Sequence, residues 1–189
     1  MATKKKIYFI TGNNNKFDEA EAIFQSEKYE LVQYDPEEEL PEYQGESEEV
    51  AIKKCLDAEV QLPEDIYPFF IEDTGLHYNC LNGMPGPYIK WFLKAKGLDG
   101  LVKLAEPYLD KTAYAQCIVT LKMDARTKPQ SFIGKLDGRI TNPRGPTNFG
   151  WDPIFEVDGY TFAEMEKVHK NKLSHRFLAL KGLGEYLSL

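Results

Sequence analysis

The sequence predicts an α/β fold, with short buried strands and amphipathic helices in one domain, 1–189. Ile7 to Ile10 is a β-branched and aromatic run bounded by a Gly-Asn cluster, which is typical of a buried strand. From Lys16 onward, apolar residues recur every three or four positions, so one face of a helix can pack back onto the sheet. A chain of 189 residues is long enough for one substantial core but short for two independent domains.

A tight turn connects this strand to this helix, and its residues are Thr11, Gly12, Asn13, Asn14, Asn15 and Lys16. One of the asparagines can cap the helix. Free backbone N–H groups, the positive end of the helix dipole and an ammonium group would then lie together, which suits a phosphate. Gly-Asn turns are also common for steric reasons alone. The turn matches neither a Walker loop nor the three-glycine dinucleotide fingerprint, so kinase, GTPase and NAD-binding functions lose support.

The next segments are a second strand, Tyr29 to Tyr34, and the most acidic stretch of the chain, residues 35–50. Most of these carboxylates are expected only to face water. Glu42 follows a proline in a turn-like LPEYQG segment, where a stiff backbone can hold a carboxylate for a metal. A capping signature at Ser47 then starts a helix that contains Lys54. Such a lysine usually only solubilises the helix, unless an anion binds nearby.

A third strand is expected at Phe69 to Ile71, ending at the EDTG segment, residues 72–75. The acids of this segment then lie where open α/β sheets bind their ligands. Consecutive strand residues point to opposite faces, so only one of the two carboxylates can enter a given site. We expect Asp73 to be that carboxylate. The alternative is a polar turn that merely ends the strand.

Residues 81–92 (LNGMPGPYIKWF) combine two glycines and two prolines, which predicts a rigid, bent connection before a helix with Lys90 in its first turn. A separate amphipathic helix is expected from Gly97 to Leu109. Tyr114 to Met123 and Gln130 to Leu136 alternate between apolar and polar residues, which indicates two strands joined by a polar turn.

The FGWDPIF segment combines features that suit the binding of a flat ring. Phe149 and Trp151 flank Gly150, whose backbone can be approached closely, and Asp152 follows them. Core packing is the more common role of such aromatic residues, so both interpretations stay open.

A basic stretch in this otherwise acidic chain precedes a C-terminal helix that is expected to reach Leu187. It contains Lys170, and its Ser-His-Arg triplet supplies His175 and Arg176. These cations form either a solvated patch or the first turn of a corner that faces an anion.

The net charge of -7 and the pI near 5.1 argue against general binding to nucleic-acid polymers or anionic membranes. A small anionic ligand needs only local positive charge. The three cysteines lack CxxC spacing and cannot all pair, which indicates a reduced, cytoplasmic compartment. The apolar run after the N-terminal lysines is too short for a signal peptide or a membrane span.

Six motifs in this order give a specific resemblance: TGNNNK, LPEYQG, EDTG, GMPGPYIKW, FGWDPIF and KNKLSHRF. Together they resemble the inosine triphosphate pyrophosphatase (Ham1) family, and its eukaryotic branch in particular. The resemblance implies an elongated α/β fold with a mixed central sheet, two lobes around a nucleotide cleft, and a homodimer. It also implies hydrolysis of nonstandard purine nucleoside triphosphates, such as ITP, dITP and XTP, to the monophosphate and pyrophosphate.

The resemblance also implies roles for individual residues and a cofactor, Mg²⁺, for which Mn²⁺ can substitute. Its metal ligands fall on Glu42 and Asp73. For the reaction itself, we expect Asp73 to orient or deprotonate the attacking water, with Glu72 as the competing candidate. Its substrate contacts fall on Thr11, Gly12, Asn13, Asn14, Asn15, Lys16, Lys54, Asp73, Thr74, Lys90, Phe149, Gly150, Trp151, Asp152, Lys170, His175 and Arg176. The rival functions are an NTPase that cuts at the γ-phosphate and a purine-nucleotide-binding protein without catalysis.

Overall fold

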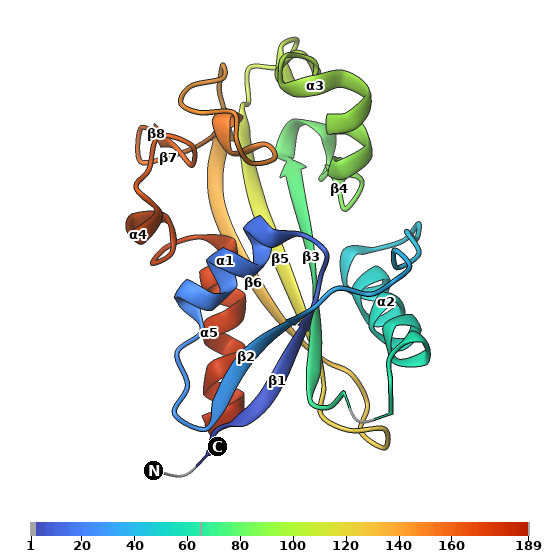
Figure 1. The fold of residues 1–189 in the computed structure, drawn as a ribbon. Coiled ribbons are helices and arrows are strands. Elements are labelled where there is room, and N and C mark those ends of the chain that lie inside the picture. Colours follow the sequence, from blue (N-terminus) through green and yellow to red (C-terminus); the bar gives the residue numbers. More distant parts are fainter. Residues whose placement is uncertain (1–2, 65, 189) are drawn as a thin grey trace. The chain divides into compact units, whose positions relative to one another are not determined.

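The computed structural model describes residues 3–64 and 66–188, and strands and helices are mixed along the chain (Figure 1). The strands are β1 (Lys5–Ile10), β2 (Tyr29–Tyr34), β3 (Phe69–Tyr78), β4 (Pro85–Gly86), β5 (Thr112–Lys122), β6 (Gln130–Ile140), β7 (Phe155–Val157) and β8 (Tyr160–Thr161). The helices are α1 (Asn14–Ile23), α2 (Ser47–Gln61), α3 (Ile89–Ala105), α4 (Lys167–Lys170) and α5 (His175–Ser188). Short 3₁₀ turns occupy Asn79–Leu81 and Asp152–Ile154.

The strands form a mixed sheet, as predicted. Within the described residues, the hydrogen-bonded order is β2-β1-β3-β5-β6-β7-β8, and β4 pairs with β3. β1 is parallel to β2 and β3, whereas β4 is antiparallel to β3 and β7 is antiparallel to both β6 and β8. β1 has parallel partners along both of its edges, and helices pack on both of its faces, which explains why its sequence is a nearly continuous apolar run.

The chain forms two compact units, each with its own core. Unit 1 contains the described residues within Met1–Asp73, Cys117–Gly134 and Arg176–Leu189. Unit 2 contains Thr74–Gln116 and Lys135–His175.

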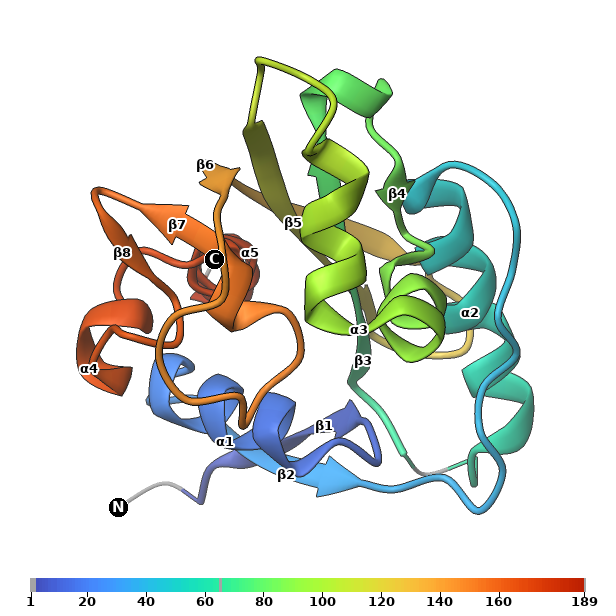
Figure 2. The same cartoon turned by 90° about the horizontal axis from the view of Figure 1, so that it is seen from above.

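In unit 1, α1 and α5 cover one face of the strands and α2 covers the other (Figure 2). Side chains that alternate along β1 enter the two layers in turn. Phe9 packs with Phe70 and the α5 residue Leu183 on one side, whereas Ile10 packs with Cys55 of α2 on the other. The Phe9 and Phe70 rings stack with their centroids 4.7 Å apart.

The core of unit 2 lies between α3 and the strands β3 and β5, and aromatic residues from the FGWDPIF segment complete it. Leu101 of α3 and Tyr78 of β3 are fully buried there, and the Tyr78 hydroxyl donates to the Leu101 carbonyl at 3.2 Å. Trp151 and Phe155 pack in the same cluster.

Strand β3 corrects one prediction, because it does not end at the acidic EDTG segment. Pairing with β1 at Phe69 and Phe70 holds the start of the strand, and pairing with β4 at Leu76 and His77 holds its second half. The polar residues between them therefore stay extended, and Glu72 and Asp73 lie in the middle of a strand that continues to Tyr78.

Two helix boundaries also differ from the predictions. Ser47 does not cap α2 but is its first residue, after an extended Glu46 whose side chain makes no capping hydrogen bond. The helix expected from Gly97 to Leu109 is the second half of α3, which ends at Ala105. Gly97 joins the halves at φ 65° and ψ -178°, a conformation that favours glycine. Among the described residues, no helix has the length and apolar character needed to cross a membrane.

Candidate active site

The turn before α1 has the geometry that its sequence predicts. Asn13 is the N-cap residue, and its side chain accepts a hydrogen bond from the Lys16 backbone N–H at 3.1 Å. The Asn13 N–H donates to the Thr11 hydroxyl at 3.1 Å. Gln33 of β2 braces the turn through its amide, which donates to the Thr11 carbonyl at 3.0 Å and to Asn14 Oδ1 at 3.1 Å. The first turn of α1 is therefore fixed in place, and the positive end of the helix dipole lies at residues 11–13.

The absence of a side chain at Gly12 allows the Asp35 carboxylate to lie close to this turn. A Cβ atom at this position would lie 2.6 Å from Asp35 Oδ1, closer than a carbon and an oxygen can approach. The carboxylate would have to move for any other residue to fit.

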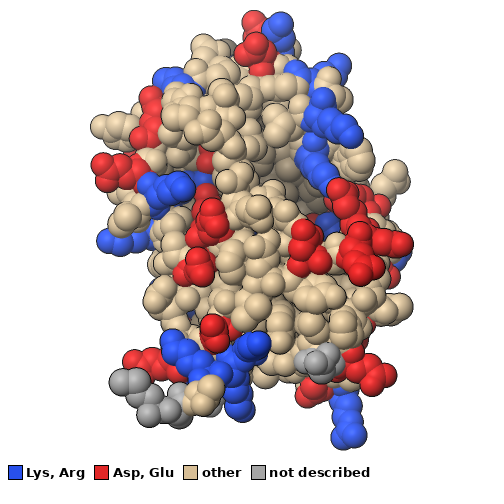
Figure 3. Space-filling model, viewed as in Figure 1, with Lys and Arg blue, Asp and Glu red and all other residues tan. Residues whose placement is uncertain are grey.

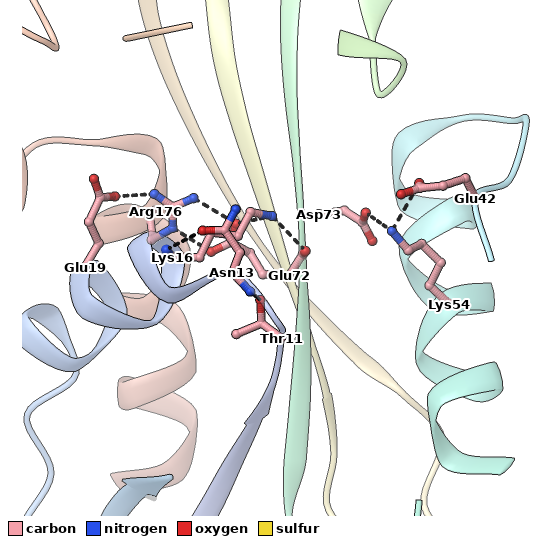
Figure 4. Close-up of polar contacts among 9 residues, drawn as sticks. All are labelled: Thr11, Asn13, Lys16, Glu19, Glu42, Lys54, Glu72, Asp73 and Arg176. Atoms are coloured by element: carbon pink, nitrogen blue, oxygen red, sulfur yellow. Dashed lines mark hydrogen bonds and ion pairs between the residues drawn. The ribbon is translucent and has the colours of Figure 1, made fainter. Parts of the chain in front are cut away.

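A buried ion-pair network lies beside this turn, and Glu72 is at its centre (Figure 4). Arg176 contacts both oxygens of Glu72, with Nε 2.6 Å from Oε2 and Nη2 2.9 Å from Oε1. The Lys16 ammonium lies 3.1 Å from Glu72 Oε1 and also donates to the Glu72 carbonyl at 3.3 Å. Burial alone would lower the pKa of Arg176, but Glu72 and Glu19 raise that pKa well above its ordinary value. Both cations therefore face carboxylates.

Glu19 was not predicted as part of this network. Glu19 lies in α1, and its carboxylate binds Nη1 of Arg176, which is 157 positions further along the sequence. The available signal was its place three residues after Lys16, which puts both side chains on one face of the helix. Nothing in the local sequence indicates that this face meets the start of α5.

A second charged group lies on the opposite side of β3, where Lys54 of α2 joins two carboxylates (Figure 4). Lys54 Nζ lies 2.7 Å from Asp73 Oδ1 and 3.3 Å from Glu42 Oε2. Burial alone would lower the pKa of Lys54, but the two carboxylates raise that pKa above its usual value. Lys54 is thus a buried cation and not the exposed solubilising residue that its position in a helix suggested.

The Glu42 and Asp73 side chains fit a hard divalent cation. Asp73 Oδ2 is buried and has no hydrogen-bond partner among residues 3–64 and 66–188, while Oδ1 of the same carboxylate binds Lys54. A buried carboxylate oxygen without a donor is costly unless a ligand compensates it. Carboxylate oxygens are the ligands that Mg²⁺ prefers.

Most of the acidic stretch before α2 is solvated, as predicted. Glu37, Glu38 and Glu39 are exposed, and the space-filling view shows acidic side chains gathered over this segment (Figure 3). Glu42 differs from these residues because it contacts Lys54, and its side chain is 33% exposed.

In unit 2, the predicted ring-binding and basic residues come together around an aromatic cluster. Lys170 Nζ lies 2.5 Å from Asp152 Oδ2, and it also lies 5.0 Å from the centre of the Phe149 ring. The His175 ring packs against Trp151, with centroids 5.4 Å apart. Trp151 is only 7% exposed and belongs to the core of this unit, so the core-packing interpretation applies to it.

Phe162 completes this cluster and was not predicted. Its ring is stacked on His175 at 5.8 Å and 9°, and it contacts Trp151 at 6.2 Å. Lys170 Nζ lies 5.2 Å from its centre. A single phenylalanine next to a short strand carries no sequence signal for this position.

The remaining predicted residues lie at the start of unit 2. Lys90 is in the first turn of α3, as expected, and its exposed ammonium lies 5.7 Å from the Trp91 ring. Thr74 is half-buried in β3, directly after Asp73. Gly150 has φ 50°, and the space around its α-carbon is open.

A sequence profile of the Ham1 family matches residues 7–186 of this chain. The chain belongs to the Ham1 family. It is 46% identical over 184 residues to an inosine triphosphate pyrophosphatase of Ajellomyces capsulatus, and the match covers 97% of each chain. It is 45% identical over 188 residues to an inosine triphosphate pyrophosphatase of Chaetomium globosum, with 99% of this chain and 95% of the relative covered. The family predicted from the six motifs is thereby confirmed.

Solved structures of Ham1 proteins have the same fold. A HAM1 protein from Coxiella burnetii aligns with a TM-score of 0.83 at 26% identity, covering 97% of this chain and 98% of that chain. A nucleoside-triphosphatase, dITP/XTP pyrophosphatase from Mycobacterium abscessus aligns with a TM-score of 0.70 at 27% identity, covering 94% and 98%. The predicted mixed α/β fold is confirmed.

Few of the described side chains are placed to bind a metal ion together. In the part of the chain that the structure describes, no group of three or more His, Cys, Asp or Glu side chains could hold a metal ion. Glu42 and Asp73 supply two carboxylates that could hold a metal if water or substrate oxygens complete its shell. This pattern is typical of Mg²⁺, which usually keeps several waters and binds one or two carboxylates together with phosphates.

Proposed function

We propose that this protein hydrolyses the nonstandard purine nucleoside triphosphates ITP, dITP and XTP to the nucleoside monophosphate and pyrophosphate. Membership of the Ham1 family and near-full-length identity to inosine triphosphate pyrophosphatases support this reaction. The structural observation that carries the proposal is the group formed by Glu42, Lys54 and Asp73. It combines a buried cation for a phosphate with a carboxylate oxygen that has no partner among the described residues.

The triphosphate is strongly anionic, so the residues that bind it have to supply positive charge. Unit 1 offers the Lys16 and Lys54 ammonium groups and the N-terminus of α1, whose backbone N–H groups suit phosphate oxygens. By family position, Lys90 and Lys170 contribute further contacts. Lys16 and Lys54 are already paired with carboxylates, so a phosphate competes with Glu72 for Lys16 and with Asp73 for Lys54.

We assign the metal to Glu42 and Asp73, with Mg²⁺ as the expected ion and Mn²⁺ as its substitute. When bound, Mg²⁺ acts as a Lewis acid that stabilises charge on the phosphate oxygens. Both carboxylates contact the Lys54 ammonium, at 3.3 Å for Glu42 and at 2.7 Å for Asp73.

Asp73 is the residue that we propose to orient or deprotonate the water that attacks the α-phosphorus in line. Its Oδ2 has no hydrogen-bond partner among the described residues, so this oxygen is available to a water as well as to the ion. Glu72 is a weaker candidate, because Arg176 and Lys16 engage both of its oxygens and its side chain is only 1% exposed.

Base choice is proposed to depend on hydrogen bonding at position 6 of the purine. A keto oxygen there accepts from donors such as Arg176, His175 or backbone N–H groups, whereas the amino group of adenine leaves such donors unpaired. Because Trp151 packs in the core against Phe155 and Phe162, we expect the half-buried Phe149 to be the aromatic residue that stacks on the ring. Stacking of this kind is indifferent to base identity.

Product analysis after incubation with ITP and Mg²⁺ tests this function. IMP and pyrophosphate in equal amounts are expected. IDP and orthophosphate would instead indicate an NTPase that cuts at the γ-phosphate, and binding of ITP without any product would indicate a nucleotide-binding protein. Comparison of ITP, XTP, GTP and ATP tests the keto hypothesis, and equal rates for ITP and ATP would contradict it. The family resemblance further suggests a homodimer that cleanses the nucleotide pool, and sedimentation of the purified protein tests the dimer.

A further inference from the structure

The segment that carries Glu42 is attached to α2 through the residue that follows it. The Tyr43 hydroxyl donates a hydrogen bond to an oxygen of Asp57, and Lys53 Nζ lies 3.9 Å from the centre of the Tyr43 ring. We call Tyr43, Lys53 and Asp57 the Tyr43 clamp. Glu42 itself contacts α2 through Lys54, at 3.3 Å. Two consecutive residues of the segment are therefore held by the same helix.

Helix geometry explains why these two contacts act together. Lys53 and Asp57 are four positions apart in α2, so they lie one turn apart on the same face and grip one aromatic ring. Lys54 is the next residue after Lys53 and points about 100° further around the helix axis. When the Tyr43 ring is fixed on the face of α2 that carries Lys53 and Asp57, the side chain of the preceding residue, Glu42, is directed towards Lys54 on the adjacent face.

The contact with Lys54 cannot orient the Glu42 carboxylate by itself. A lysine ammonium is a compact charge on a flexible stem, so it attracts a carboxylate without fixing its direction. Residues 41–44 have irregular backbone, and the Glu42 side chain is 33% exposed. Such a segment keeps a single conformation only when its side chains are tied to a rigid element.

We propose that Tyr43 is a positioning residue for the metal, because its clamp on α2 sets the direction in which Glu42 presents its carboxylate beside Asp73. This inference rests on the proposed function, in which Glu42 and Asp73 hold the ion. Tyr43 itself is not among the residues proposed to bind the metal or the substrate. Loss of its hydroxyl should therefore weaken metal binding and leave the chemical step intact once metal is saturating.

The variant Tyr43→Phe tests this inference, and Tyr67→Phe is its matched control. Tyr43→Phe keeps the ring over Lys53 and removes only the hydrogen bond to Asp57. Tyr67 also donates from its hydroxyl to a carboxylate of α2, Glu59 Oε1 at 2.7 Å, two helical residues beyond Asp57. Each variant loses one tyrosine-to-carboxylate hydrogen bond on the same helix, and only the first is next to Glu42.

Two measurements are made on each protein. Mn²⁺ binding without nucleotide is followed by electron paramagnetic resonance, and pyrophosphate release from ITP is measured as a function of Mg²⁺ concentration. We expect Tyr43→Phe to raise both the Mn²⁺ dissociation constant and the Mg²⁺ concentration at half-maximal rate by roughly two- to tenfold, the effect of one hydrogen bond. Turnover at saturating Mg²⁺ should return to the wild-type value. Tyr67→Phe should change neither constant.

Glu42→Gln separates this inference from the proposed function. If Glu42→Gln weakens Mn²⁺ binding and Tyr43→Phe does not, the metal assignment stands and the positioning role is overturned. A positioning role is also overturned if Tyr67→Phe shifts the metal constants as much as Tyr43→Phe. If the wild-type protein binds no Mn²⁺, or if Glu42→Gln binds it as well as wild type, the metal assignment fails and the inference fails with it.

Discussion

Replacement of Glu72 by glutamine tests the buried ion-pair network of unit 1. The Glu72 and Arg176 side chains are 1% and 2% exposed, and the substitution keeps the size of the side chain while it removes the charge. Removing one partner of a buried ion pair costs about 3–5 kcal/mol, because the other charge stays buried. Glu19 still faces Arg176 in the variant, so we expect a loss near the lower end, about 3 kcal/mol. For a chain of this length, that loss corresponds to a fall in Tm of roughly 6–12 °C.

Urea unfolding followed by circular dichroism measures this loss of stability. The control is Lys181→Ala, which removes an exposed ion pair whose side chains are 59% and 70% exposed. That variant should stay within about 0.5 kcal/mol of wild type. A loss below about 1 kcal/mol for Glu72→Gln would show that the network is no stronger than a surface pair and would refute this reasoning.

The activity of the same variant separates Glu72 from Asp73. Asp73→Asn removes the proposed proton acceptor and should lower turnover by about 10²- to 10⁴-fold, at a temperature where the protein is folded. Glu72→Gln should lower turnover far less. If Glu72→Gln falls as far as Asp73→Asn, the carboxylate of Glu72 participates in the chemistry.

Three further predictions concern unit 2. Burial lowers the pKa of His77 in the folded protein, so folding favours the neutral imidazole. This contribution to stability is fully present above the pKa of the unfolded chain, about 6.5, and it is lost as the pH falls below that value. His77→Gln should therefore flatten the decline in unfolding free energy on the acid side, by at most about 1.4 kcal/mol per pH unit in urea titrations, and an unchanged slope would contradict this. Asp152→Asn removes the carboxylate 2.5 Å from the buried Lys170 ammonium and should cost about 3 kcal/mol in urea unfolding, so a loss below about 1 kcal/mol would refute a buried pair. Phe162→Ala leaves a cavity beside His175 and should cost about 3–5 kcal/mol with a raised KM for ITP, whereas an unchanged KM would remove Phe162 from the ring site.

Local sequence was sufficient to predict a residue's structural role where that role is set by its neighbours in the chain. The cap at Asn13 and the strand from Tyr29 to Tyr34 follow from patterns within a few positions, and the structure has both. The alternation of Glu72 and Asp73 across β3 follows from the period of a strand, once the segment is known to be extended.

The length of β3 and the ion-pair network depend on contacts that the local sequence does not contain. Two acids in succession resemble the polar end of a strand. Glu72 is tolerated in the middle of β3 because Arg176, 104 positions away, supplies two hydrogen bonds to it. The position of Glu19 beside Arg176 has the same origin.

Motif order identified residues whose local sequence suggested only ordinary roles. Lys54 has the sequence context of a solubilising helix residue, and Glu42 lies in an acidic run that is otherwise solvated. Family position singled out each of them as a site residue, but it did not predict their contact with each other. Family position does not extend to the Tyr43 clamp, because its evidence is geometric.

Hydrolysis of ITP in ¹⁸O-labelled water tests the central claim most directly, because the label reports which phosphorus the water attacks. Residues that direct water to the α-phosphorus, as proposed for Asp73, predict one labelled oxygen in IMP and unlabelled pyrophosphate. Label in pyrophosphate would place the attack on the β-phosphorus. Label in orthophosphate would place it on the γ-phosphorus, and either result would contradict the proposed reaction.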